Sequence, residues 1–366
     1  MTTRRDFIAL TAGALAASPL LSAASTVQPA IVPAAQPLSI LVLGGTGFLG
    51  PHQIEYAIAR GHQLTLFNRG SSSGMYGEAV EELTGDRDSK VGSGLSALHG
   101  ERTWDAVIDN SGYIPRHVRD SAALLKDRCR RYLYISTVAV YDFGSGSEFA
   151  EDARLAELDD PSVEEVTNET YGPLKAACDR AAREILGARC TVVRPTYVVG
   201  PGDTTDRFTY WVERIHRGGD VLAPPGPAIE MQWVDARDLC PWVITLVEND
   251  TPGVFNAAGP ASFIDRTGLM WGLRAQTAEP VRFHWPGDDL LGELGIDLPL
   301  MGSTDSTHFA NAPSLAAGLR YRSLTDTAAA TLSWWQSLPG DRRSNPRSWP
   351  TAVQEQAAIE QLRSAR

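Results

Sequence analysis

The stretch "ILVLGGTGFLG", residues 40–50, is the strongest structural signal in this 366-residue chain. Four apolar residues lead into Gly44, Gly47 and Gly50, and a segment with helical spacing follows. Glycines at such positions permit a tight turn, a close approach of the backbone to a pyrophosphate, and close packing of helix on strand. A helix that starts there directs its first N–H groups at the phosphates. The stretch therefore predicts a dinucleotide-binding turn between a strand and a helix.

Downstream of this turn, short apolar runs alternate with helical stretches. Helices are predicted at residues 50–61 and 117–128, and strands at residues 38–44, 63–68, 81–86, 105–111, 131–137 and 190–195. This alternation is typical of an α/β protein and predicts a Rossmann-type doubly wound parallel sheet with a smaller C-terminal substrate domain. We expect the dinucleotide-binding domain at residues 38–200, a substrate-binding region interleaved with the core at 201–340, and a C-terminal helical tail at 341–366.

The N-terminus has the features of an export signal. Arg4 and Arg5 are adjacent, a threonine precedes them, and phenylalanine, isoleucine and a mild apolar run follow. This pattern resembles the twin-arginine signal, and small residues suit cleavage after Ala24. Residues 1–24 are predicted to be a signal peptide that the twin-arginine export machinery recognises. Residues 25–37 are predicted to be a Pro/Ala linker, and the mature chain to be periplasmic or otherwise exported.

Two alternatives for the N-terminus are an apolar helix with two chance arginines and a membrane-spanning helix. The apolar run is short, rich in Ala and Gly, and broken by Pro19, whereas a span needs about 20 strongly apolar residues. We therefore expect no stable membrane span after cleavage.

The composition argues against a nucleic-acid partner and against a metal site. The formal net charge is −11, and nucleic-acid phosphates need clusters of Lys and Arg. Buried free thiols are expected rather than disulfides, and no metal-ligand spacing is seen among the histidines. The residues concerned are Cys129, Cys178, Cys190 and Cys240, and His52, His99, His117 and His308.

The end of the second predicted strand faces the adenosine ribose in this fold. An acidic residue there binds the 2'-hydroxyl of NAD, but this chain has Asn68 and Arg69, followed by Gly70 and serines 71–73. An arginine with nearby hydroxyls suits a 2'-phosphate, so NAD and NADP both remain open. Asp86 is a candidate to accept a hydrogen bond from the adenine amino group, with an exposed strand-end carboxylate as the alternative.

The segment "YGPLK" places Tyr171 and Lys175 four residues apart near a helix start, so both side chains share one helix face. A nearby cation favours the phenolate and is expected to lower the pKa of Tyr171. With ten Tyr and three Lys in the chain, chance pairing is a poor explanation. Ser136 and Thr137, in "YISTVAVY", end a predicted strand at the edge where such folds bind ligands.

Together with "VVRPTYVVGPGD" (192–203), these motifs resemble the extended short-chain dehydrogenase/reductase family, in particular its NAD-dependent epimerase/dehydratase branch. The resemblance covers residues 38 to about 335. It implies that Tyr171 is the catalytic acid/base, that Lys175 binds the nicotinamide ribose, and that Thr137 contacts the substrate oxygen, with Ser136 as the other candidate. The cofactor residues that it implies are Gly44, Thr46, Gly47, Phe48, Leu49, Gly50, Asn68, Arg69, Asp86, Asn110, Ser111, Gly112, Ser136, Tyr171, Lys175 and Pro195.

Candidate substrate contacts lie beyond residue 200. They are Arg207, Tyr210, Trp211 and Gln232, since an arginine with aromatic residues suits sugar hydroxyls or an anion; packing between domains is the alternative. Residues 206–244 also resemble a bacterial group related to chloroplast stem-loop-binding proteins. That resemblance raises an RNA-binding alternative, which the acidic composition disfavours.

The expected function is that of an exported NAD(P)-dependent epimerase- or dehydratase-like enzyme that acts on a secondary alcohol of a sugar or similar small molecule. Hydride transfer is expected, with Tyr171 taking the hydroxyl proton, and the cofactor is expected to be tightly bound. One alternative is an NADP-dependent reductase or dehydrogenase of a small carbonyl compound. A more distant one is a non-catalytic RNA- or ligand-binding protein of the same fold. Whether the chain forms a homodimer is left open.

Overall fold

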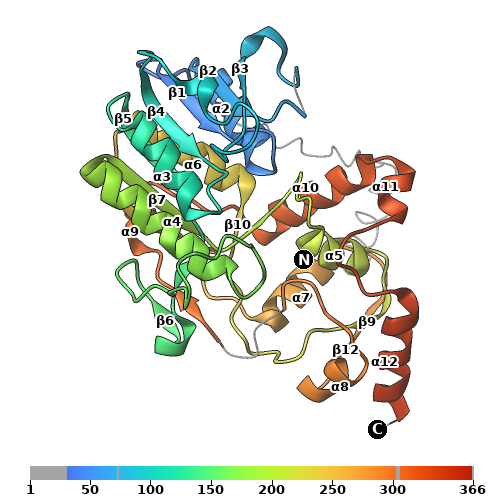
Figure 1. The fold of residues 1–366 in the computed structure, drawn as a ribbon. Coiled ribbons are helices and arrows are strands. Elements are labelled where there is room, and N and C mark those ends of the chain that lie inside the picture. The colour runs from blue at the N-terminus through green and yellow to red at the C-terminus, as the bar shows by residue number, and fades with distance from the viewer. Residues whose placement is uncertain (1–30, 72–73, 302–305, 365–366) are drawn as a thin grey trace, which may run out of the picture. The chain divides into compact units, whose positions relative to one another are not determined.

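Seven parallel strands form one sheet in the part of the chain that the structure describes, residues 31–71, 74–301 and 306–364 of a computed structural model (Figure 1). The spatial order is β11-β7-β5-β4-β1-β2-β3, so the chain builds outward from β1 and then crosses over to build from β4. This confirms the predicted doubly wound sheet. The bounds are β1 Ser39–Leu43, β2 Gln63–Asn68, β3 Glu81–Thr84, β4 Trp104–Asp109, β5 Cys129–Ile135, β7 Cys190–Pro195 and β11 Gly253–Ala257. The predicted signal peptide lies outside the described residues.

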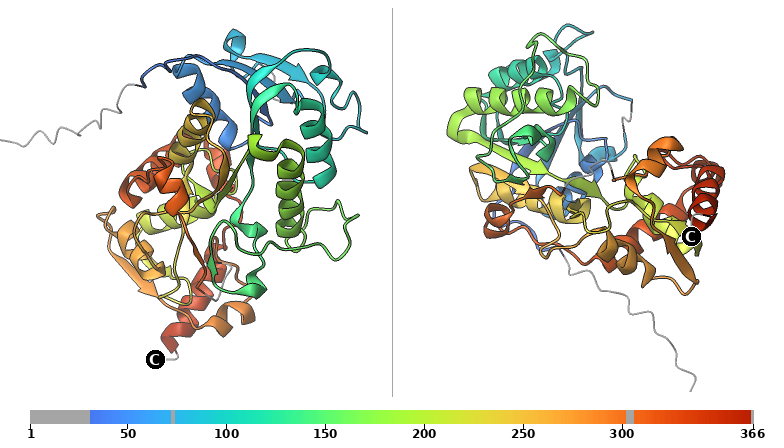
Figure 2. Two further views of the ribbon diagram at one scale, coloured as in Figure 1. Left: turned by 90° about the vertical axis from the view of Figure 1, so that its left-hand side faces the viewer. Right: turned by 90° about the horizontal axis from the view of Figure 1, so that it is seen from below.

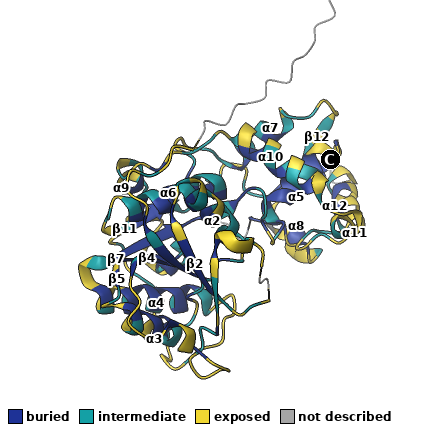
Figure 3. Ribbon diagram, turned by 90° about the horizontal axis from the view of Figure 1, so that it is seen from above, coloured by how far each residue is buried: buried dark blue, intermediate teal, exposed yellow. Residues whose placement is uncertain are grey.

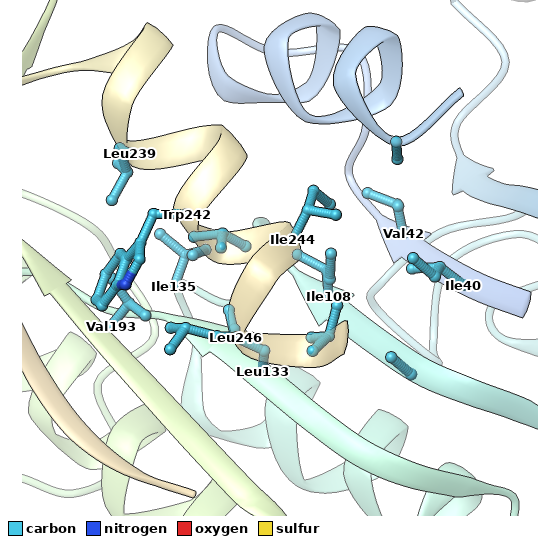
Figure 4. Packing of buried hydrophobic residues seen from close by; sticks show 14 of the residues in the cluster. Ile40, Val42, Ile108, Leu133, Ile135, Val193, Leu239, Trp242, Ile244 and Leu246 are labelled. Atoms are coloured by element: carbon cyan, nitrogen blue, oxygen red, sulfur yellow. The ribbon is translucent and has the colours of Figure 1, made fainter. Parts of the chain in front are cut away.

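Helices cover both faces of this sheet (Figure 3). Helices α2 (Leu49–Ala59) and α6 (Ala236–Glu248) lie on one face, and α3 (Pro115–Leu125) and α4 (Tyr171–Leu186) on the other. In Figure 4, Leu239, Trp242 and Ile244 of α6 face strand residues that include Ile108 and Val193. Because both faces are covered, the strands are nearly continuous apolar runs, as parallel sheets require.

Three strands of the sheet, β3, β4 and β5, end two residues earlier than predicted, β1 ends one residue earlier, and β11 was missed. Strand β4 ends at Asp109, because the Ser111 amide donates to the Asp109 carboxylate at 3.1 Å and turns the chain. Strand β3 ends at Thr84, because the Asp86 amide donates to the carbonyl of Gly94, outside the sheet. Strand β11 was missed because its short sequence, GVFNA, contains glycine and asparagine and lacks a clear strand pattern.

A second group of helices and strands, mostly yellow to red in Figure 2, follows in the later part of the chain. Buried apolar side chains give this group its own core. Its helices are α5 Arg207–His216, α7 Arg266–Arg274, α8 Asp288–Glu293, α10 Leu324–Ser337, α11 Gly340–Ser344 and α12 Ala352–Ser364. Strands β9 (Gly219–Leu222) and β12 (Val281–His284) pair within it. Five further short elements lie outside the seven-stranded sheet: β8 (Tyr197–Val199) pairs with β10 (Trp233–Asp235), β6 (Glu148–Phe149) pairs with β13 (His308–Phe309), and α9 spans Ala312–Ala316. Within residues 201–340, strand β11 belongs to the sheet and helix α6 packs against it.

The four cysteines are buried and free, as predicted. Within residues 31–71, 74–301 and 306–364, no helix combines the length and apolar character that crossing a membrane requires.

Candidate active site

The glycine turn after β1 is built for close backbone approach. Gly44 has φ +82°, in the left-handed region that favours glycine. A Cβ on Gly50 would overlap the backbone oxygen of Gly45, so α2 can start this close to the turn only with glycine there. A Cβ on Gly47 would meet nothing within 4 Å, which leaves open space above that residue. No side chain caps the start of α2 and its first turn has no acidic residue, so its N–H groups can receive an anion.

The end of β2 presents a hydrogen-bond donor in place of a carboxylate. The Asn68 Oδ1 accepts from the Gly70 amide at 2.7 Å, while its Nδ2 is buried without a partner. Arg69 beside it is exposed. Asp86 is partly exposed and one of its oxygens accepts from the Asp88 amide. Of the neighbouring serines, Ser72 and Ser73 lie outside the described residues.

Lys175 is fixed by two backbone carbonyls. It follows Tyr171 by one turn of α4 and is 3% exposed. Its Nζ donates to the carbonyl oxygens of Gly112 and Ile135, each at 2.8 Å, and lies 4.3 Å from the ring centroid of Tyr134. These carbonyls follow β4 and end β5, so the lysine connects three elements at one edge of the sheet. Burial lowers the pKa of Lys175 to about 8.

This lowered pKa predicts a pH dependence of stability. In the unfolded chain a lysine titrates near pH 10.4, so between about pH 8 and pH 10.4 the unfolded chain binds one proton more than the folded protein. Stability then rises with pH over this window. We expect the free energy of unfolding of the wild type, relative to Lys175→Met, to increase by about 3 kcal/mol across it.

Urea unfolding of the wild type and of Lys175→Met at a series of pH values measures this difference. Lys126→Met, at an exposed position after α3, is the matched control. A difference that stays constant from pH 7 to pH 11 would show that folding does not lower the pKa of Lys175.

Tyr171 begins α4 and lines the same cleft as Lys175. Burial and the nearby Tyr113 raise the pKa of Tyr171, whereas a hydrogen bond with Thr137 and the charge of Arg207 lower it. The rings of Tyr113 and Tyr171 are 6.4 Å apart. The prediction that Lys175 lowers the pKa of Tyr171 is therefore wrong in this structure, because burial of the phenol outweighs the neighbouring charges.

A buried ion pair supports the segment after β4. Arg87 donates to both carboxylate oxygens of Asp109, at 2.6 and 2.9 Å, and to the Oγ of Ser111 at 3.1 Å. Tyr132 donates to the same carboxylate at 2.7 Å. The ion pair of Arg87 and Asp109 fixes the turn that includes Ser111. The next residue, Gly112, accepts a hydrogen bond from Lys175 through its carbonyl oxygen. Sequence reasoning missed Arg87 and Asp109, since their partners are distant in the chain.

A cleft of about 1410 Å³ joins the glycine turn to the region beyond residue 200. The predicted site residues that line it are Gly44, Gly47, Phe48, Leu49, Gly50, Asn110, Ser136, Thr137, Tyr171, Lys175, Pro195, Arg207 and Gln232. Those outside its lining are Thr46, Asn68, Arg69, Asp86, Ser111, Gly112, Tyr210 and Trp211. Within the described part of the chain, no group of His, Cys, Asp and Glu could hold a metal ion.

Two polar side chains of the cleft differ in their freedom to bind a ligand. The amide of Asn110 exchanges two hydrogen bonds with Gln53 of α2, so it holds the helix to the sheet. The Ser136 Oγ is buried without a hydrogen-bond partner. Thr137 accepts from the Ala139 amide at 3.2 Å. Ser136 and Thr137 thus both remain candidates for a ligand oxygen.

Three of the four predicted substrate contacts have structural roles. Tyr210 and Trp211 are buried in the second core, and the Trp211 Nε1 donates to the carbonyl of Pro299 at 2.7 Å. Gln232 lines the cleft, but its amide group exchanges both hydrogen bonds with the backbone of Phe309. The expectations for Tyr210 and Trp211 are corrected, because helix α5 turns these aromatic residues into the second core. Gln232 stays at the cleft, with its amide group held by the backbone of Phe309. Arg207 alone of the four directs a charge into the cleft.

Sequence reasoning also missed the aromatic residues of the cleft. Tyr113, Phe143 and Tyr197 line it and are each more than a third exposed. The Arg207 guanidinium lies 5.3 Å from the ring centroid of Tyr197. A signal was present for Tyr113, because it directly follows the segment 110–112 that was assigned to the cofactor.

A model of the NAD dependent epimerase/dehydratase family matches residues 40–258. Chloroplast stem-loop binding protein of 41 kDa b from Arabidopsis thaliana is 26% identical over 246 residues, which is 62% of this chain and 60% of that protein. The chain thus matches about three-fifths of that relative's length.

Solved structures share the fold at low identity. UDP-glucuronic acid 4-epimerase from Bacillus cereus, in complex with NAD, has a TM-score of 0.58 and 15% identity, over 81% of this chain and 98% of that chain. Human epimerase family protein SDR39U1, with NADPH, has a TM-score of 0.56 and 21% identity, over 82% of this chain and all of that chain.

Proposed function

The chain belongs to the NAD-dependent epimerase/dehydratase family, and from its cleft we propose that it is an NAD(P)-dependent enzyme that acts on a secondary alcohol of a sugar or similar small molecule. The observation that carries this proposal is the convergence of three features on one cleft. These are the glycine turn, a buried lysine held by two carbonyls, and a partly buried tyrosine one helical turn before it.

The residues of the cleft fit a dinucleotide. The open space above Gly47 and the uncapped start of α2 suit a pyrophosphate, and the unpartnered Ser136 Oγ suits a nearby polar group. When bound, the nicotinamide ring supplies hydride exchange with a substrate carbon. The unpartnered Nδ2 of Asn68 and the exposed Arg69 are donors, which favours the 2'-phosphate of NADP over the 2'-hydroxyl of NAD.

Tyr171 is proposed to move the proton of the substrate alcohol. The raised pKa favours the protonated phenol, which can donate its proton to a carbonyl oxygen when hydride is added to the substrate. In the reverse direction the phenolate takes the proton of the substrate alcohol as hydride leaves, so the two half-reactions return Tyr171 to its starting state. Lys175 adds positive charge at the helix face below it. Arg207 and the aromatic residues Tyr113 and Tyr197 are proposed substrate contacts, suited to a ring that carries an anionic group.

Export through the twin-arginine route is a further part of the proposal. It rests on the adjacent Arg4 and Arg5 in "TTRRDFIAL", residues 2–10. This route carries folded proteins, so a dinucleotide bound in the cytoplasm can leave with the chain. Outside the cytoplasm no pool replaces a spent cofactor, which favours epimerisation or internal dehydration, since neither needs net oxidation or reduction. It also favours free sugars or glycosides over nucleotide sugars.

Cell fractionation tests location and cofactor together. We expect the wild type in the periplasm with about one dinucleotide per chain, identified by mass after denaturation. The change of both Arg4 and Arg5 to lysine, which keeps the charge, should hold the protein in the cytoplasm with the same nucleotide. Export that survives the change would remove the twin-arginine proposal, and an empty exported protein would favour the reductase alternative.

The RNA-binding alternative, prompted by the name of the plant relative, is disfavoured by the net charge of −11.

A further inference from the structure

The segment that follows α10 is bound to a residue at the rim of the cleft. Arg342 of α11 donates from Nη2 to both carboxylate oxygens of Asp206, at 2.6 and 2.7 Å. The Arg347 amide donates to the same carboxylate at 2.8 Å, and the Trp349 Nε1 donates to the Asp206 carbonyl at 2.9 Å. Arg347 also donates from Nη1 to the carbonyl of Thr204 at 2.9 Å. We call Arg342, Arg347 and Trp349 the C-terminal clamp.

Asp206 is an unusual residue to find at this place. Its side chain is fully buried, and its backbone has φ +58°, in the left-handed region. A buried carboxylate needs a partner, and a non-glycine residue in this conformation costs about 1–2 kcal/mol unless its surroundings hold it. Arg342 supplies the partner, and the hydrogen bonds to both the backbone and the side chain hold the conformation.

The clamp has a rigid seat of aromatic rings. Trp349 lies with its ring centroid 5.2 Å from Trp335 of α10 and 5.6 Å from Tyr210 of α5. Tyr210 in turn contacts Trp211 at 4.9 Å, and the Arg342 guanidinium lies 5.2 Å from the Trp335 ring. This packing explains why Tyr210 and Trp211 point away from the cleft.

The residues immediately before and after Asp206 in the chain line the cleft. Residues 203–205 and Arg207 are among its lining. The Asp203 Oδ1 accepts from the amide and the hydroxyl of Thr205, and that hydroxyl accepts from the Arg207 Nε at 3.0 Å. Among the described residues, Arg207 makes no ion pair with a carboxylate, so its charge is available to a ligand. The backbone of Asp206 therefore sets where Arg207 lies.

We propose that Asp206 is a positioning residue that the C-terminal clamp holds, so that Arg207 is fixed toward an anionic group of the substrate. The proposal rests on the proposed function for the identity of the ligand, but not for the geometry. It gives residues 342–349, which lie outside the family match at 40–258, a role in substrate recognition. The charge of Arg207 also lowers the pKa of Tyr171, which agrees with its facing the reaction site.

The test compares Arg342→Ala with Arg343→Ala, a neighbouring exposed arginine that does not contact Asp206. The first readout is hydrogen–deuterium exchange of the full-length protein. Arg342→Ala should speed exchange of amides in 203–208 by roughly tenfold or more, while peptides of the glycine turn at 40–50 stay unchanged. Arg343→Ala should change neither, and Arg342→Lys, which keeps the charge but offers fewer donors, should give an intermediate effect.

The second readout is kinetic and separates positioning from general stability. With pyruvate as the carboxylate-bearing test ketone and diacetyl as its uncharged counterpart, Arg342→Ala should raise KM for pyruvate by roughly tenfold, on the scale of one charge-assisted contact. The KM for diacetyl, kcat and the Kd for NADPH should stay within about twofold.

Three results would overturn the inference. The first is that Arg342→Ala leaves amide exchange at residues 203–208 unchanged. The second is that it speeds exchange at residues 40–50 as much as at 203–208. The third is that Arg342→Ala and Arg343→Ala have equal effects. If the wild type binds no NADPH, the proposed function fails, and the exchange experiment still decides whether the clamp fixes Asp206.

Discussion

Tyr171→Phe is expected to lower turnover by about 10²–10⁴-fold, the range for loss of a general acid or base. The change deletes one hydroxyl and keeps the ring, so packing at the start of α4 is preserved. Tyr171 lies in the cleft beside Thr137, and its phenol is the group there that can give a proton to a substrate oxygen. The measurement is the single-turnover loss of absorbance of NADPH bound to the enzyme, with diacetyl as the test carbonyl, together with the number of dinucleotides retained per chain, which should stay the same.

Tyr113→Phe is the matched control for this experiment. Tyr113 is a tyrosine of the same cleft, 6.4 Å from Tyr171 between ring centroids, and it lies over the Lys175 ammonium. Tyr113 is proposed to contact the substrate through its ring, which the change to Phe keeps, and no proton transfer is assigned to its hydroxyl, so we expect turnover within about threefold of the wild type. Equal activities of the Tyr171 and Tyr113 variants would show that the family role does not transfer to Tyr171.

The parts of the site that could be predicted from sequence depend on neighbours along the chain. The turn with Gly44, Gly47 and Gly50 and the pair Tyr171 and Lys175 each lie within eleven residues, where strand, turn and helix geometry fixes relative position. The parallel, doubly wound sheet followed from the alternation of strands and helices, because parallel strands need crossover connections. The structure brings these motifs to one cleft, as that topology requires.

The parts that could not be predicted depend on partners far apart in sequence. Arg87 meets Asp109 across 22 residues, and Asp206 meets Arg342 across 136. No local pattern marks either pair. The pKa of Tyr171 was misjudged for a related reason, because spacing shows which charge is near while only packing shows how deeply a phenol is buried.

Arg194→Met is expected to lower the free energy of unfolding by about 3–5 kcal/mol, the cost of leaving a buried charge without its partner. Arg194 of β7 is almost fully buried, and its guanidinium reaches the Asp179 carboxylate at 2.9 Å through both Nε and Nη2. It also donates to the Tyr141 hydroxyl at 2.9 Å. The other ion pair of Asp179 within the described part of the chain is with Arg183, at 3.8 Å and half exposed, which is too distant to replace the lost contact. Urea unfolding followed by circular dichroism measures the change.

The double variant Arg194→Met with Asp179→Leu separates charge from packing. A buried ion pair replaced by apolar side chains of similar size is often tolerated, so the double variant should recover most of the stability that the single change loses. Asp179 lies one turn beyond Lys175 on α4, and Tyr141 follows Thr137 in the chain. The pair therefore fixes the helix and the loop that carry the proposed catalytic groups. If the double variant regains stability while its turnover stays reduced, the buried charges serve the geometry of the site. If the double variant is as unstable as the single variant, the loss of stability comes from packing.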